Sequence, residues 1–156
     1  MTSKSVISFA SSLSSSQPEL SLGIFENRKF KVGTAYFSEG SYEQAAYYFK
    51  RFLDSVERSY APNDDRTIMA NEKLADAEAM CNKKKSAIYH YRTVINETRE
   101  KLCDDLIDAD YEGVLNRRFS RVLVNCGNVF LRLTRETKDQ AQFGSYCENA
   151  IEVRYV

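Results

Sequence analysis

Apolar side chains recur along most of this chain at intervals of three and four residues, which places them on one side of a helix. Ala45, Phe49, Phe52 and Val56 form one such stripe. Polar turn segments separate the stripes, and no stretch alternates apolar and polar residues as a strand does. The pattern predicts an all-α fold with helices at about residues 18–39, 42–60, 66–81, 86–102, 115–133 and 138–153.

The segment DDLIDADYEG, which follows Leu102, allows two interpretations. It either continues the fourth helix past Leu106 or forms an acidic loop that Gly113 closes. The sequence pattern leaves this choice open.

Composition and charge favour a single domain of a soluble, globular type. The chain has 156 residues, and its 22 basic and 22 acidic side chains give a net charge of zero. This balance gives no electrostatic reason to expect nucleic acid or an anionic membrane as partner. Residues 1–17 are serine-rich and predict a flexible N-terminal tail, with the folded domain over 18–156. No apolar run approaches the roughly 20 residues of a membrane span. Reduced thiols indicate a reducing compartment, so we expect a cytoplasmic protein.

The residues that most often carry chemistry are few. Four cysteines have no CxxC spacing, and His90 is the only histidine, so neither a metal site nor a cofactor is expected. We expect reduced and mostly buried thiols. His90 is predicted to point outward without a partner. No phosphate loop, GxSxG or HExxH motif occurs, and the chain is therefore not expected to be an enzyme.

Three consecutive helix pairs share small and aromatic residues at corresponding places. These residues are Gly33, Tyr36, Gly40-Ser41-Tyr42, Ala45, Phe49 and Phe52-Leu53 in the first pair; Leu74, Ala75, Ala87, Tyr91, Val94 and Ile95 in the second; Gly127, Phe130, Ala150 and Ile151 in the third. The first pair resembles the tetratricopeptide (TPR) repeat closely, and the other two resemble it more weakly. The second pair has Glu78 where that repeat has an aromatic residue.

Small residues suit the places where two helices cross, because a large side chain would separate the helices. Gly33 and Ala75 are 42 residues apart (75 − 33), whereas a minimal TPR repeat has about 34. The chain thus resembles longer-repeat TPR proteins such as kinesin light chain and the Pins-type scaffolds. The resemblance implies an α-α superhelix of three TPR-like helical hairpins, at about residues 22–60, 66–108 and 115–154.

In TPR proteins the first helix of each hairpin lines a concave groove, and the resemblance therefore implies a set of groove residues. Asn125 and Asn128 are expected to clamp the backbone of a partner peptide, because an amide both donates and accepts hydrogen bonds. Basic residues in the set favour an acidic peptide. Phe30 and Phe37 either offer an apolar pocket or pack under the N-terminal tail. The set is Asn27, Phe30, Lys31, Thr34 and Phe37, then Met69, Glu72, Lys73, Asp76 and Met80, then Arg121, Val124, Asn125, Asn128 and Arg132.

The expected function is that of a scaffold or adaptor that binds a protein or peptide partner in the concave groove. One alternative is a self-associating assembly module, or a fragment of a larger TPR protein, because IEVRYV follows the sixth predicted helix without a polar capping helix. A homo-oligomer would then form through the uncapped helical end. A small helical enzyme that uses a cysteine or the histidine is the less favoured alternative.

Overall fold

The computed structural model describes residues 23–104, 106–137 and 145. Within this part the chain forms five helices and no strand, so the predicted all-α fold is confirmed there. The predicted tail over 1–17 and sixth helix over 138–153 lie outside the described ranges. The helices are α2 (Ile24–Ser38), α3 (Tyr42–Val56), α4 (Asp65–Met80), α5 (Lys84–Leu102) and α6 (Ala109–Glu136).

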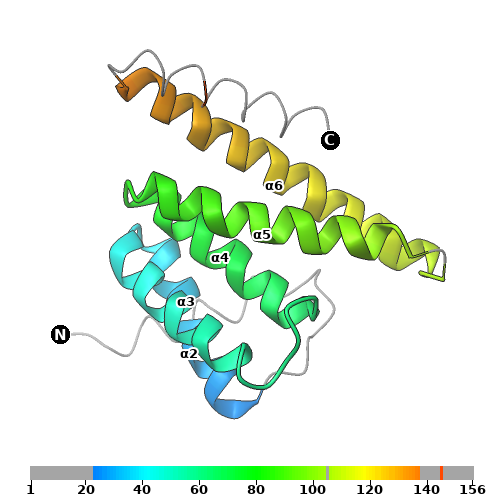
Figure 1. The fold of residues 1–156 in the computed structure, drawn as a ribbon. Helices are drawn as coiled ribbons and strands as arrows, with labels where there is room; N and C mark the ends of the chain where they lie inside the picture. Colours follow the sequence, from blue (N-terminus) through cyan, green and yellow to red (C-terminus); the bar gives the residue numbers. More distant parts are fainter. Residues whose placement is uncertain (1–22, 105, 138–144, 146–156) are drawn as a thin grey trace.

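Each helix packs chiefly on the helix that follows it in the sequence, from α2 through to α6, and α4 also contacts α6 (Figure 1). The stack therefore grows in chain order, from α2 at one end to α6 at the other. Such stepwise packing fits the predicted α-α superhelix. It leaves α4 in the middle, with α3, α5 and α6 around it.

The turns that end α2 and α4 have the same backbone geometry. Gly40 has a φ of +79°, and the amide of the next residue, Ser41, donates to the carbonyl of Tyr36. Asn82 has a φ of +66°, and the amide of Lys83 donates to the carbonyl of Glu78 in the same way. A left-handed residue with this hydrogen bond is the Schellman helix end, which glycine and asparagine tolerate best. The two turns are 42 residues apart (82 − 40), the same spacing as Gly33 and Ala75.

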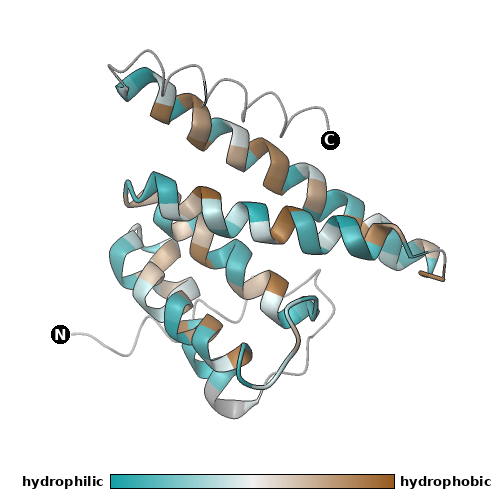
Figure 2. Cartoon of the chain, viewed as in Figure 1, coloured by the Kyte–Doolittle hydropathy of each residue, from teal (hydrophilic) through white to brown (hydrophobic). Residues whose placement is uncertain are grey.

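The apolar stripes predicted from the sequence meet in two clusters, and Figure 2 shows apolar residues interleaved with polar ones along the helices. Helix α4 contributes to both clusters, from different sides. One cluster joins α2, α3 and α4 and has at its centre Ala45, Ala46, Phe49, Phe52, Leu53, Val56, Met69, Ala70, Leu74 and Ala77. The other joins α4, α5 and α6 and contains Ile68, Ala75, Ala79, Ala87, Ile88, Tyr91, Val94, Ile95, Val122, Cys126, Val129 and Phe130.

Gly33 is buried where α2 crosses α3, as the sequence predicts. A Cβ atom at this position would lie 2.8 Å from two ring atoms of Phe49. Only a residue without a side chain allows the two helices to approach this closely.

The start of α6 differs from the prediction. The helix begins at Ala109 instead of about residue 115, because Asp108 caps it and its carboxylate accepts from the amides of Asp110 and Tyr111. Gly113 lies inside the helix and closes no loop. Between the two alternatives for DDLIDADYEG, the structure shows a short connection after Leu102 and helix from Ala109 onward.

Replacing Gly33 by alanine is expected to lower the free energy of unfolding by about 1–3 kcal/mol, because the added methyl group overlaps the buried Phe49 ring. Gly113→Ala is the matched control, since its Cβ would meet only the end of the Arg117 side chain, at 3.5 Å. That substitution should be neutral or stabilise by up to about 1 kcal/mol through helix propensity. Urea unfolding followed by circular dichroism measures both, and equal effects would contradict the close approach of α2 and α3.

Candidate functional site

The two phenylalanines expected in the groove pack on α3. The Phe30 ring centroid lies 5.3 Å from that of Phe52, and the Phe37 ring lies 5.2 Å from Tyr42 in an edge-to-face arrangement. Both residues are half-buried and border the cluster of α2, α3 and α4. Their main role in the structure is therefore to hold α2 on α3.

The other groove residues predicted on α2 and α4 differ in their exposure to solvent. Lys31 and Thr34 are exposed on α2, although the Thr34 hydroxyl donates to a carbonyl of its own helix at 2.9 Å. Asn27 and Lys73 are half-buried. Met80, at the end of α4, is exposed, and Met69 is buried in the core.

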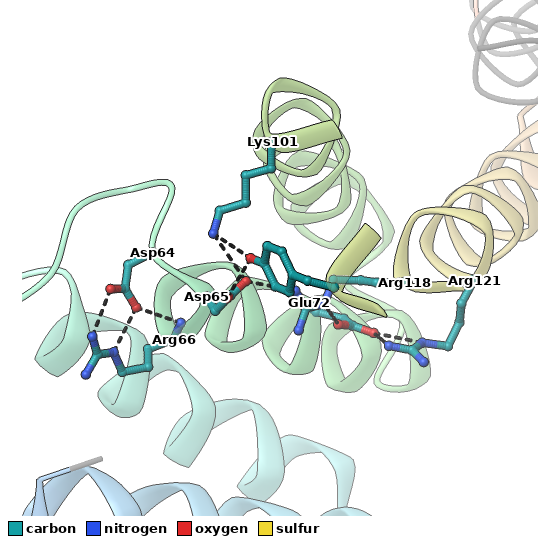
Figure 3. A network of polar contacts seen from close by, with 8 residues as sticks. Asp64, Asp65, Arg66, Glu72, Lys101, Arg118 and Arg121 are labelled. Atoms are coloured by element: carbon teal, nitrogen blue, oxygen red, sulfur yellow. Dashed lines mark hydrogen bonds and ion pairs between the residues drawn. The ribbon is translucent and has the colours of Figure 1, made fainter. Parts of the chain in front are cut away.

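Carboxylates of α4 bind side chains of α6 along the line where the two helices meet. Glu72 is 2% exposed. Its Oε1 accepts from the Arg121 Nε at 2.9 Å, and its Oε2 lies 3.5 Å from the Arg118 Nε. One turn further, the Asn125 amide donates to Asp76 at 3.3 Å. Figure 3 shows Glu72 between the two arginines.

Asp65 begins this line at the start of α4. Its carboxylate accepts from the Tyr111 hydroxyl at 2.7 Å and lies 3.2 Å from Arg118 and 3.3 Å from the Lys101 ammonium (Figure 3). Arg118 thus bridges Asp65 and Glu72 with a side chain that is only 9% exposed. We call the contacts of Asp65, Glu72 and Asp76 with α6 the polar ladder.

Burial and hydrogen bonding act against each other on Asp76. Burial raises the pKa of its carboxyl, and the hydrogen bond from the Tyr91 hydroxyl, at 2.6 Å, opposes that rise. The same burial, together with the nearby carboxylate, raises the pKa of Tyr91. For Lys101, burial lowers the pKa, but contacts with Tyr111 and Asp65 outweigh it and leave the pKa raised. The contacts with Tyr111 and Asp65 therefore favour the charged form of Lys101.

The sequence pointed to Glu72, Asp76, Arg121 and Asn125, but not to their contacts with one another. Asp65, Lys101, Tyr111 and Arg118 were missed. A signal did exist: Asp65, Glu72 and Asp76 follow one another at intervals of seven and four, which puts three acids on one side of a helix. Which helix supplies the partners depends on the packing and is not visible in one sequence.

Helix α6 also carries a row of exposed side chains beside the ladder. They succeed one another at intervals of three and four, so they lie along one side of the helix. The row extends over about 27 Å, since a helix rises about 1.5 Å per residue. Val124 in its middle is 61% exposed. We call this row the α6 stripe; it consists of Arg117, Arg121, Val124, Asn128, Arg132 and Arg135.

Asn125 and Asn128, the predicted backbone clamp, have different surroundings. The Asn125 amide nitrogen is engaged with Asp76, whereas Asn128 is exposed within the α6 stripe. Arg121 forms an ion pair with Glu72. Among the described residues, Arg117, Arg132 and Arg135 form no salt bridge, so the stripe is basic although the whole chain is neutral.

The prediction that His90 points outward is wrong, because the residue is 9% exposed between α4 and α5. Its Nδ1 lies 2.8 Å from the Asn71 Oδ1, and the Asn71 amide donates to the Thr67 carbonyl. Asn71 therefore accepts from the Nδ1–H of a neutral imidazole. The Nε2 lies 3.8 Å from the Glu78 Oε2. Burial, with a smaller effect of Lys50, lowers the pKa of His90 to about 4.

Glu78 and His90 form a polar pair at the positions that two tyrosines occupy in the first hairpin. Tyr36 and Tyr48 stack there with ring centroids 5.5 Å apart. The residues 42 positions later are Glu78 and His90. Burial raises the pKa of Glu78 and lowers that of His90, so it shifts both groups toward their neutral forms. The pair packs α4 against α5, although the sequence pattern places His90 on the surface.

The described residues show no arrangement typical of covalent or metal chemistry. In residues 23–104, 106–137 and 145, no three His, Cys, Asp or Glu side chains gather as a metal ion would need. Cys126 is buried, and burial raises its pKa to about 11, which disfavours the reactive thiolate. Cys103 is exposed and Cys81 half-buried, so the three described thiols are less buried than expected, while Cys147 lies outside the described residues. No helix in this part of the chain has the length and apolar character needed to cross a membrane.

Comparisons of the chain with protein families, with curated proteins and with solved structures find no match.

Glu72→Ala is expected to lower the free energy of unfolding by about 1–3 kcal/mol, because it removes one of the two carboxylates that the buried Arg118 contacts and also the partner of Arg121. Arg121→Ala, which removes the other partner, should cost at most about 1 kcal/mol, because the Arg121 side chain is 48% exposed and Glu72 keeps Arg118. Urea unfolding of the two variants gives the comparison. If both substitutions lowered the free energy of unfolding equally, the buried contact between Glu72 and Arg118 would contribute no more than the exposed contact with Arg121.

Stability should fall as the pH is lowered from 6.5 to 4, because the unfolded chain binds a proton at His90 in this range and the folded chain does not. The expected loss is roughly 1–3 kcal/mol. Glu78 acts in the opposite direction, since its pKa is raised in the fold. The free energy of unfolding is measured across this pH range for the native chain and for His90→Gln. The difference between the two pH profiles reports on His90, the only histidine in the sequence. A variant with the same pH slope as the native chain would contradict a neutral, buried His90.

Proposed function

We propose that this chain is a TPR-like scaffold or adaptor that binds an acidic segment of another protein along the first helices of its hairpins. The observation that carries the proposal is the α6 stripe, with four arginines, an amide and an exposed valine along one side of a helix. Basic side chains attract an acidic segment and set its direction, while the valine offers an apolar contact.

The hairpin geometry supports the same proposal. Two Schellman turns and two buried small residues, Gly33 and Ala75, recur at the same interval of 42 residues, which supports a helical repeat of this length. Stacked helical hairpins present their first helices on a shared face, and proteins built in this way usually act by binding. The polar ladder contributes rigidity, because it fixes α6 relative to α4 before any partner arrives.

The partner surface of the proposal is narrower than the sequence suggested. Exposed Lys31, Thr34, Asn128 and Arg132 are available to a ligand. Phe30 and Phe37 are used in packing, and Arg121 is shared with the ladder. The C-terminal half of the α6 stripe is thus the part to test first.

Selection from a random displayed peptide library should enrich peptides rich in Asp and Glu. Their affinity, measured by fluorescence polarisation, should fall about ten-fold in the double variant Asn128→Ala, Arg132→Ala. Asn96→Ala, Arg99→Ala is the matched control, because it removes the same two residue types from the exposed side of α5. Binding should also weaken with added salt.

Unchanged binding in the Asn128→Ala, Arg132→Ala variant would move the ligand site off this part of α6, and an equal loss in the control would show that the loss is not specific to the α6 stripe. Enrichment of peptides without acidic residues would overturn the charge argument. Circular dichroism of both variants excludes unfolding as the cause of a loss.

A further inference from the structure

The connection between α5 and α6 carries an exposed leucine among acidic residues. Leu106 is 91% exposed, the largest exposed fraction among the large apolar residues of the described chain. Asp104 precedes it, and three exposed acidic residues follow it at the start of α6. We call these residues the acidic loop: Asp104, Leu106, Asp108, Asp110 and Glu112.

The acids of the loop are not neutralised by neighbouring cations. Among the described residues, none of them forms a salt bridge, and the nearby Lys101 is engaged with Asp65. Two of the carboxylates, on Asp104 and Asp108, accept backbone amides, which holds the loop in shape. Burying a leucine that water surrounds almost completely is favourable, because it removes apolar surface from water.

The acidic loop and the α6 stripe complement each other. The loop offers carboxylates around an exposed leucine, and the stripe offers arginines around an exposed valine. They cannot meet within one chain over most of their length. Asp108 and Arg132 are 24 residues apart on a continuous helix (132 − 108), which corresponds to about 36 Å.

We propose that the acidic loop of one molecule docks on the α6 stripe of a second copy of this chain. The inference rests on the proposed function, because it names the acidic segment that the same stripe binds. The two surfaces differ, so the contact is head-to-tail, and a dimer keeps one free loop on one copy and one free stripe on the other. Association then continues beyond the dimer with rising concentration. Because the contact is small and charged, it is weak and sensitive to salt.

The test uses the full chain and three double variants at exposed positions. The stripe variant is Arg117→Ser, Arg132→Ser, and the loop variant is Leu106→Ser, Asp110→Asn. The control is Lys85→Ser, Arg99→Ser, which removes two exposed cations from α5 at nearly the same separation. Sedimentation velocity gives the average mass of each as protein concentration and salt are varied, and circular dichroism checks the fold.

The native chain and the control should rise in mass past the dimer, and the rise should disappear at high salt. Each loop or stripe variant alone should stay monomeric. An equal mixture of the two should form a 1:1 complex and nothing larger, because the loop variant keeps an intact stripe and the stripe variant keeps an intact loop. A head-to-tail contact therefore predicts that the two variants associate only when they are mixed.

Three results would overturn the inference: a native chain that stays monomeric, association that stops at the dimer, or variants that associate like the native chain. The peptide selection separates its failure from that of the proposed function. A monomeric chain whose stripe binds acidic peptides keeps the function and loses the self-docking. Association that needs both loop and stripe, with no acidic peptide selected, supports the self-docking and contradicts the peptide-binding function.

Discussion

Helix α4 lies between two apolar clusters, and its packing takes four carboxylates wholly or partly out of water. A buried carboxylate without a partner destabilises a fold by several kcal/mol, so each must find a donor or take up a proton. Asp65, Glu72 and Asp76 find donors on α5 and α6, and Glu78 lies against His90. The positions of α5 and α6 around α4 follow from this requirement as much as from apolar contact. Arg118 is central, since it serves two carboxylates at once.

Ion pairs within the fold change the charge of the exposed surface. The chain has equal numbers of acidic and basic side chains, but α4 uses several of its acids internally. The exposed side of α6 is consequently basic, while the connection before it is acidic. This separation also suits α6 itself, because acids near a helix start and bases near its end both complement the helix dipole. A formal charge of zero thus conceals two oppositely charged surfaces on one helix.

Much of the fold could be predicted because it depends on local rules. Apolar spacing gave the helices, and Gly40 marked a turn that only a flexible residue favours. The close approach at Gly33 also followed from its small size. The polar ladder could not be predicted, because it depends on how α4 and α6 rotate against each other. For the same reason His90 was placed outside: its spacing resembles that of a surface residue, and only the position of Asn71 and Glu78 shows that it is buried.

The order in which the helices pack has a consequence for synthesis in the cell. Because each helix rests mainly on the one before it, a segment that leaves the ribosome already has its packing partner. The pair α2–α3 can close while α5 is still being made, and α4 then covers the apolar side of α3. Among the described helices, each therefore waits mainly for its neighbour in the sequence, which shortens the time during which the nascent chain can aggregate.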